Sequence, residues 1–319
     1  MRQGKLSSSE LKKNVLEVIK HRRPEIISGA ALGEDCAEFS GSGKFLISTD
    51  PITGKTANLG SLAIKVASND VIASGGEPFL AMLTIIAPIT AKPSDIKIVM
   101  EDAEAEAAKM NLEIAGGHTE FSDSVNRMIA SCTVIGKTNK HITATNPKIG
   151  DSIVVTKDVG LEGINIIVEN LSDELGLSIE EIEEAKNYSN SLSILEEGRI
   201  CRDFNVGSMH DITEGGIFGA ISEVCEGAGV GAELYVEKIP VTKLSKKVAD
   251  KIGIDIYKLL SSGSLLVTTS SPSELIELLS KAKIKATEVG VITGKLPYAV
   301  YSNGTKKLLK VCPDELFNV

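Results

Sequence analysis

The chain has 319 residues, of which 42% are apolar and 24% charged, the balance of a globular protein long enough for two domains. Its net charge of −9 at pH 7 disfavours binding to a nucleic-acid backbone, which requires a basic surface. Aromatic residues make up 4% of the chain and tryptophan is absent, which also disfavours base stacking on single-stranded nucleic acid.

Five cysteines are scattered through the sequence without a CxxC pair. This pattern suits a reducing compartment and argues against a disulfide framework or a structural zinc site. The first residues lack the apolar core of a secretory signal, and no apolar run approaches the length of a membrane span. The sequence therefore predicts a cytoplasmic protein that does not contact a membrane.

In chain order, the first predicted element is an amphipathic helix over residues 7–23. Ser7 and Glu10 have the spacing of a capping box, and Pro24 ends the helix. The strands and helices predicted next are strands over 44–50, 79–88, 112–121 and 126–138, and helices over 60–78 and 93–111. The third of these strands is expected to run into a glycine turn at Gly116 and Gly117.

A cluster of turn residues at 146–151 is the best candidate for a domain boundary. We place an N-terminal domain at 1–148 and a C-terminal domain at 149–319. The second half begins again with a strand, and a helix is expected after Gly216. Its other predicted elements are strands over 152–158, 231–237 and 263–270, and helices over 161–170, 179–187, 191–204, 242–252 and 272–282. The predicted fold class is mixed α/β.

The common phosphate-binding motifs are absent. GKT occurs at 54–56 and 136–138, but Thr49 and Ser131 stand where a Walker A loop needs glycine. The glycine-rich run at 227–231 follows a predicted helix rather than a strand, so the dinucleotide fingerprint fails as well.

Carboxylates instead lie beside glycine turns or at strand ends in five short segments. These segments are GEDCA (33–37), STD (48–50), SND (68–70), GGHTE (116–120) and MHDITEGG (209–216). Mg²⁺ takes oxygen ligands, often one or two carboxylates together with substrate phosphates. Asp35, Asp50 and Asp70 are therefore a candidate Mg²⁺ site, and the backbone at Gly116 and Gly117 is suited to close approach by a phosphate.

The segment at 209–216 has two interpretations. A helix start stabilises anions, so Thr213 and Glu214 fit either a simple helix cap or a phosphate or substrate site. His118 and His210 either donate to backbone carbonyls in turns or act as acid–base groups near neutral pH. If the segment is a site, Asp211 either helps to hold a metal or orients His210.

The order of these motifs resembles the aminoimidazole ribonucleotide synthetase-like superfamily over roughly residues 33–300. The resemblance rests on G-[DE]-D-x-A, a strand ending in T-D, N-D before GGEP, then GGHTE and H-D-x-T-E-G-G. The superfamily includes that purine enzyme, thiamine-monophosphate kinase, selenophosphate synthetase and the hydrogenase maturation factor that dehydrates a thiocarboxamide. GGHTE and MHDITEGG look most like the hydrogenase-maturation branch.

The resemblance implies a two-domain α/β fold whose N-terminal domain forms a β-barrel with its copy in a homodimer. It implies ATP and Mg²⁺ as cofactors, and phosphorylation or activation of a carbonyl- or amide-type oxygen. The implied metal ligands are Asp35, Asp50, Asp70 and Glu120. The implied nucleotide contacts are Gly116, Gly117, Thr119, Asn69 and Thr213. The implied catalytic residues are His210, Asp211, Glu214 and His118.

The chain also differs from the proteins that it resembles. The hydrogenase factor ends in a reactive cysteine, whereas Cys312 is followed by Pro313 and an apolar tail that predicts a packed end. Two alternatives stay open: a ligase or kinase of the aminoimidazole ribonucleotide or thiamine-monophosphate type, and a nucleotide-binding partner protein without turnover. Lys157 is either a phosphate contact or an exposed side chain, and Glu196 and Glu197 are predicted on a solvated helix face. The expected acceptor is a small molecule or a group carried by a protein.

Overall fold

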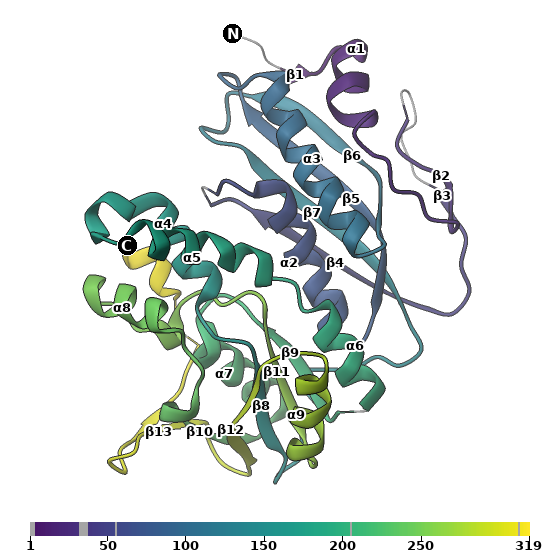
Figure 1. Ribbon diagram of the computed structural model, residues 1–319. Coiled ribbons are helices and arrows are strands. Elements are labelled where there is room, and N and C mark those ends of the chain that lie inside the picture. The colour runs from purple at the N-terminus through teal and green to yellow at the C-terminus, as the bar shows by residue number, and fades with distance from the viewer. Residues whose placement is uncertain (1–3, 32–37, 55, 205, 312) are drawn as a thin grey trace. The chain divides into compact units, whose positions relative to one another are not determined.

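The structure is a computed structural model that describes residues 4–31, 38–54, 56–204, 206–311 and 313–319 (Figure 1). The chain divides into two compact units. The N-terminal unit comprises Met1–Ile72 and Gly76–Lys140, and the C-terminal unit comprises Ala73–Gly75 and His141–Val319. Each unit combines helices with a β-sheet, which confirms the predicted mixed α/β class.

The N-terminal unit is built on a five-stranded sheet in the order β1-β6-β5-β7-β4. β5 and β6 run parallel, whereas the other neighbouring strands run antiparallel. The strands are β1 (Gly4–Lys5), β4 (Lys44–Ile52), β5 (Glu77–Pro88), β6 (Glu113–Ser122) and β7 (Ile129–Thr138). A separate two-stranded ribbon pairs β2 (Ile26–Ser28) with β3 (Glu38–Phe39).

Two helices, α2 (Leu59–Ala73) and α3 (Pro93–Lys109), cover one face of the five-stranded sheet (Figure 1). They pack closely at Gly60, where a Cβ would lie 1.9 Å from the carbonyl oxygen of Val99. Side chains along β7 alternate between buried and half-exposed, as expected for a strand with one covered face. Among the described residues no helix covers the opposite face, which we call the open face, and Ile47 on it is 69% exposed.

The N-terminal helix is shorter than predicted. It consists of α1 (Ser8–Leu11) and a π-helical turn, η1 (Lys12–Leu16). The capping box is confirmed, because the Ser7 N–H donates to Glu10 Oε2 at 3.0 Å. Farther along, one carboxylate oxygen of buried Glu104 accepts the backbone N–H groups of residues 20 and 21. These N–H groups are thereby satisfied without a helix, and the predicted continuation to residue 23 does not form.

The C-terminal unit has a seven-stranded sheet in the order β14-β13-β10-β12-β8-β11-β9. Only the neighbours β10 and β13 run parallel. The strands are β8 (Ser152–Thr156), β9 (Ser208–Ile212), β10 (Gly231–Tyr235), β11 (Ser264–Thr269), β12 (Ala286–Thr293), β13 (Tyr298–Val300) and β14 (Lys306–Leu308).

Helix α7 (Gly216–Ala228) packs on one face of this sheet, where Ile217, Ile221 and Val224 join the largely aliphatic core. The other α-helices of the unit are α4 (Leu161–Leu175), α5 (Ile179–Asn187), α6 (Leu195–Phe204), α8 (Lys243–Ile252) and α9 (Pro272–Lys281). The short 3₁₀ turns are η2 (Tyr188–Ser191), η3 (Val236–Lys238), η4 (Ile256–Lys258) and η5 (Glu315–Asn318). None of the helices in the described ranges is both long and apolar enough to cross a membrane.

Candidate functional site

The GGHTE segment lies inside strand β6, so the predicted glycine turn is wrong. Gly116 and Gly117 pair with Met82 and Leu83 of β5. A Cβ at Gly117 would lie 1.8 Å from the carbonyl oxygen of Leu83, so glycine is required for the close approach of the two strands. A glycine pair signals close backbone approach, and the sequence could not distinguish a neighbouring strand from a phosphate.

His118 and Glu120 lie on the open face of the sheet, in register with Thr84 and Ile86 of β5. His118 Nε2 is 3.3 Å from Glu120 Oε2, and both side chains are exposed. Thr119, between them, points to the covered face and is buried. The pair can bind a polar group or exchange a proton at this surface.

Asp50 and Asp70 belong to the covered side of the sheet. Asp50 in β4 lies opposite Cys132 of β7, and its charge adds to burial in raising the pKa of the Cys132 thiol to about 12. Ser48, two residues earlier on the same face of β4, donates to Asp70 Oδ2 of α2 at 2.5 Å. Two carboxylates and a hydroxyl are hard oxygen groups of the kind that Mg²⁺ prefers. Asn69, the neighbouring residue in α2, is fully buried.

The predicted metal ligands are only partly brought together. Asp35, like Cys36 and Cys312, lies outside the described residues. Glu120 lies on the opposite face of the sheet from Asp50, so the two do not ligate one ion within a chain. In the part of the chain that the structure describes, no group of three His, Cys, Asp or Glu side chains is placed to hold a metal. Asp50 and Asp70 thus fit Mg²⁺ as the one or two carboxylates that share an ion with water and phosphates.

In the C-terminal unit, MHDITEGG forms the end of β9 and the turn into α7. Strand alternation sends the side chains of His210 and Asp211 to opposite faces of the sheet. His210 Nδ1 is 2.5 Å from the Asp211 carbonyl oxygen, and His210 Nε2 is 3.5 Å from Glu223 Oε2 on α7. The carboxylate that faces His210 is therefore Glu223, and the predicted orientation of His210 by the Asp211 carboxylate is wrong.

Thr213 does not cap α7, which corrects the simple cap interpretation. The N-cap residue is Gly215, in a left-handed conformation with φ 76°, and it has no side-chain cap. Its N–H donates instead to Asp314 Oδ2, at 2.7 Å and from 99 residues farther along the chain. Thr213 contributes its carbonyl oxygen, which accepts the N–H groups of Gly216 and Ser261 at 3.1 and 3.3 Å. The anion at the start of this helix is thus a carboxylate of the chain itself.

The C-terminal end is anchored by a polar contact rather than by its apolar residues. Asp314 is 3% exposed, whereas the side chain of Phe317 is mostly exposed. The predicted packed end is therefore correct only at Asp314. Sequence reasoning missed this residue, because a single aspartate near a chain end has no motif or spacing that indicates its partner.

Glu162 in the first turn of α4 is a second buried acid that the sequence did not reveal. It is 4% exposed, bonds to the backbone and side chain of Ser262, and leaves Oε2 without a hydrogen-bond partner. Burial, with smaller contributions from the charges of Asp314 and Glu214, raises the pKa of Glu162 to about 7. Hydrogen bonds from Ser262 oppose this rise.

We expect Glu162→Gln to become more stable relative to wild type as the pH rises. Between the ordinary value of 4.5 and the folded-state pKa of about 7, the folded protein keeps a proton that the unfolded chain has lost. The free energy of unfolding of wild type therefore falls across this window, by on the order of 3 kcal/mol. Urea unfolding of both proteins at pH 4.5 and pH 8 measures the difference, and a difference that is the same at both pH values would contradict the assignment.

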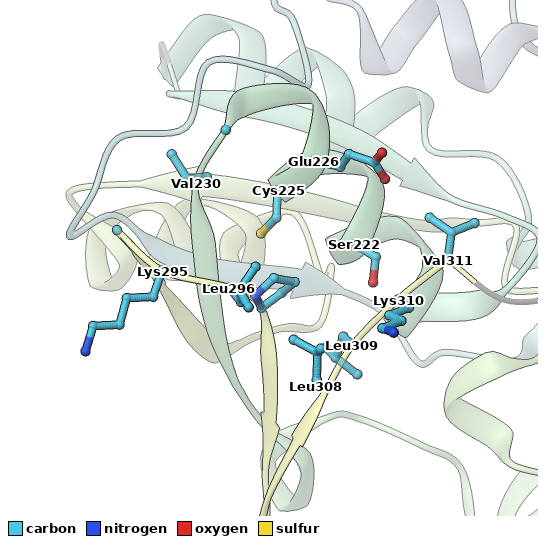
Figure 2. Close-up of a pocket in the computed structure, with 13 residues that line it drawn as sticks. Ser222, Cys225, Glu226, Val230, Lys295, Leu296, Leu308, Leu309, Lys310 and Val311 are labelled. Atoms are coloured by element: carbon cyan, nitrogen blue, oxygen red, sulfur yellow. The ribbon is translucent and has the colours of Figure 1, made fainter.

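A pocket of about 750 Å³ lies at the C-terminal end of α7, where Cys225 and Val230 meet Leu296 and Leu309 (Figure 2). None of the predicted site residues lines it. Burial raises the pKa of the Cys225 thiol to about 11, so this cysteine stays protonated and poorly nucleophilic at neutral pH. The side chain of Lys295 points away from the pocket (Figure 2).

Family comparisons agree with this architecture. Residues 33–138 match the family model of the N-terminal domain of AIR synthase related proteins, and residues 148–302 match that of the C-terminal domain. The chain belongs to the AIR synthase related protein family. This confirms the resemblance drawn from the motif order, and it confirms the two-domain fold of that family.

Among named relatives, a Methanocaldococcus jannaschii protein named for hydrogenase expression and formation is 25% identical over 219 residues. The match covers 68% of this chain but only 64% of that relative, just under two thirds of its length. A selenide, water dikinase of Pasteurella multocida is 25% identical over 325 residues, covering 88% of this chain and 89% of the relative.

Solved structures of the hydrogenase maturation protein HypE share the fold. E. coli HypE superposes with a TM-score of 0.82 at 20% identity, covering 96% of this chain and 97% of HypE. A HypE complex with ATP gives 0.81 at 17% identity, covering 97% and 96%. A HypE–HypF complex gives 0.75 at 20% identity, covering 83% and 90%.

Proposed function

We propose that the chain is an ATP- and Mg²⁺-dependent enzyme that activates a carbonyl- or amide-type oxygen by phosphoryl transfer, as a HypE-like hydrogenase maturation protein. The observation that carries the proposal is the match of both family domains, in order, across residues 33–138 and 148–302. The ATP complex of HypE, which shares the fold over 97% of this chain, supports the choice of nucleotide.

We assign metal and nucleotide binding and action on the acceptor to different sets of residues. In the N-terminal unit, we assign Asp50 and Asp70, with the motif residue Asp35, to Mg²⁺. Bound Mg–ATP supplies the phosphoryl group, and the cation offsets the repulsion between phosphates and these carboxylates. The residues that we propose as nucleotide contacts are Asn69, Gly116, Gly117, Thr119 and Thr213. Glu120, predicted from the sequence as a metal ligand, lies on the open face, and we assign it to act there together with His118.

The C-terminal unit supplies the groups proposed to act on the acceptor. Glu214 is exposed at the turn before α7, where a carboxylate can hold or move a proton of the substrate. Asp211 is buried in β9, where electrostatic interactions with the acceptor are screened less than in water. His210 Nε2 lies 3.5 Å from Glu223 Oε2, so the ring is placed where it can contact the acceptor together with a carboxylate. We further propose a cytoplasmic location and an acceptor that is either small or delivered by a partner protein. HypE itself forms a complex with HypF, which supports a protein partner.

Nucleotide binding should depend on Mg²⁺. We expect calorimetry to give an affinity for ATP that is at least about tenfold weaker in EDTA than in Mg²⁺, because unshielded phosphates would face several carboxylates. Asp50→Asn and Asp70→Asn should weaken the Mg²⁺-dependent affinity, whereas Glu101→Gln, at an exposed acid of α3, should not. Equal affinity in EDTA would contradict the metal proposal. Binding without ATP turnover would instead favour the non-catalytic partner protein.

We also propose a homodimer formed through the open face of the N-terminal sheet. Ile47 and Phe45 of β4 are exposed there, so this face carries more apolar surface than a solvated face needs. Light scattering at micromolar concentration is expected to give twice the chain mass of 33.8 kDa. Ile47→Lys should reduce the mass to that of a monomer, while Ile98→Lys, at another exposed isoleucine, on α3, should leave it unchanged. A monomeric wild-type protein would count against the proposal.

A further inference from the structure

Asp314 near the C-terminus joins three separate stretches of the C-terminal unit. Its carboxylate accepts the N–H of Gly215 at 2.7 Å, that of Leu316 at 2.8 Å, and that of Leu260. Burial raises the pKa of Asp314, and these three donors oppose the rise by stabilising the charged form. The turn before α7, the loop after η4 and the C-terminal segment therefore share one buried acceptor.

The hydrogen bond from the Gly215 N–H to Asp314 satisfies a backbone donor at the start of helix α7. α7 has 13 residues, and its first N–H groups have no partner within the helix. A carboxylate at this end meets both an unpaired N–H and the positive end of the helix dipole. The turn is closely packed, because a Cβ at Gly216 would lie 2.5 Å from the carbonyl oxygen of Tyr257.

The loop on the other side of the turn is held equally firmly. The Ser261 hydroxyl accepts the N–H of Gly160 and donates to the carbonyl oxygen of Leu259, both at 2.7 Å. The Ser261 N–H also donates to the carbonyl oxygen of Thr213 at 3.3 Å. Thr213 and Gly215 are thus both bonded to groups outside the turn, and Glu214 is the residue between them.

We propose that Asp314 is a positioning residue: by fixing the backbone of Gly215 and Leu260, it sets the direction in which Glu214 meets the acceptor. This inference rests on the proposed function, because it assigns a task to the turn that carries Glu214. The C-terminal segment then contributes to the site through one carboxylate bound to backbone N–H groups, without contacting substrate itself. Loss of that carboxylate would free the turn while leaving the nucleotide-binding residues of the N-terminal unit intact.

The test compares Asp314→Asn with Glu104→Gln, which removes another buried carboxylate that accepts two backbone N–H groups, in the other unit. Mg–ATP is the substrate, and kcat, KM, melting temperature and amide exchange of residues 213–219 are measured. We expect Asp314→Asn to lower kcat by roughly ten- to a hundredfold, with a smaller rise in KM through Thr213, which lies in this turn, and with faster exchange of these amides. Glu104→Gln should leave kcat and this exchange unchanged.

The outcomes separate the inference from the function on which it rests. Wild-type protein without ATP turnover overturns the proposed function, while exchange at residues 213–219 still shows whether Asp314 holds the turn. Faster exchange in Asp314→Asn with normal kcat overturns the positioning role, as does an equal loss of kcat in both variants. If Asp314→Asn does not fold, Asp314→Glu keeps the charge and displaces it by one methylene. A lowered kcat at an unchanged melting temperature then supports the inference, and a normal kcat overturns it.

Discussion

Replacing Asp211 by asparagine is expected to lower kcat for ATP-dependent turnover by about a hundredfold or more, with little change in melting temperature. The carboxylate is buried in β9, opposite Leu265 of β11, and a charge in such surroundings interacts strongly with charge that develops in a transition state. Asparagine has nearly the same shape, so the fold should tolerate it while the charge is lost. An interaction made only in the transition state lowers kcat and kcat/KM together.

Asp151→Asn is the matched control for this experiment. Asp151 is also a buried aspartate of the C-terminal unit, but its carboxylate accepts the N–H of Lys148 in a turn at 3.0 Å. Its replacement should reduce stability by about 1 kcal/mol and leave kcat unchanged. Glu214→Gln should lower kcat if Glu214 handles a substrate proton. Normal turnover in both Asp211→Asn and Glu214→Gln would leave the segment at 209–216 with a structural role only.

Lys157→Met is expected to lower the free energy of unfolding by about 3–5 kcal/mol. The Lys157 ammonium group lies 2.7 Å from Glu197 Oε1, and it also donates to the carbonyl oxygens of Ser191 and Ser193 at 2.8 and 2.6 Å. Glu197 is almost fully buried, so removal of the cation leaves a buried carboxylate without its counter-ion. Burial lowers the pKa of Lys157, and the attraction of Glu197 opposes this change. Urea unfolding at pH 7 measures the loss.

Two further variants test whether the loss of stability comes from leaving the buried Glu197 without its counter-ion. Lys157→Met with Glu197→Met removes both charges, and we expect the double variant to recover most of the lost stability. Lys285→Met breaks the neighbouring, more exposed pair with Asp158, whose ammonium and carboxylate atoms lie 2.6 Å apart. That change should cost at most about 1 kcal/mol. A small loss for Lys157→Met, similar to that for Lys285→Met, would show that the buried pair is not a major source of stability.

The Lys157–Glu197 pair also shows what local sequence patterns miss. Glu196 and Glu197 are adjacent and were both predicted on a solvated helix face, yet Glu196 is exposed and Glu197 is buried. The prediction for Glu197 is wrong, and Lys157 is neither exposed nor free to reach a phosphate. The partners are 40 residues apart, and no pattern within a single helix or strand indicates which of two glutamates meets a distant lysine.

Element types were predictable wherever apolar periodicity was strong. The helix over 179–187 coincides with α5, and the strand over 79–88 lies within β5, because burial of one face imposes a period on the sequence. Predictions failed where polar contacts with distant residues replaced local ones. The N-terminal helix ends at Leu16, and the N–H groups of residues 20 and 21 bond to the distant Glu104. GGHTE pairs with β5 as a strand, with Gly117 against Leu83.

By itself, the sequence determined the mixed α/β class, the family and the candidate residues, because periodicity and motif order are local properties of the chain. Only the tertiary structure decided how these residues are grouped. It placed Asp50 and Glu120 on opposite faces of one sheet, paired His210 with Glu223, and brought Asp314 to the start of α7. Such groupings depend on strand register and on contacts between residues as many as 99 positions apart, which adjacent residues do not encode.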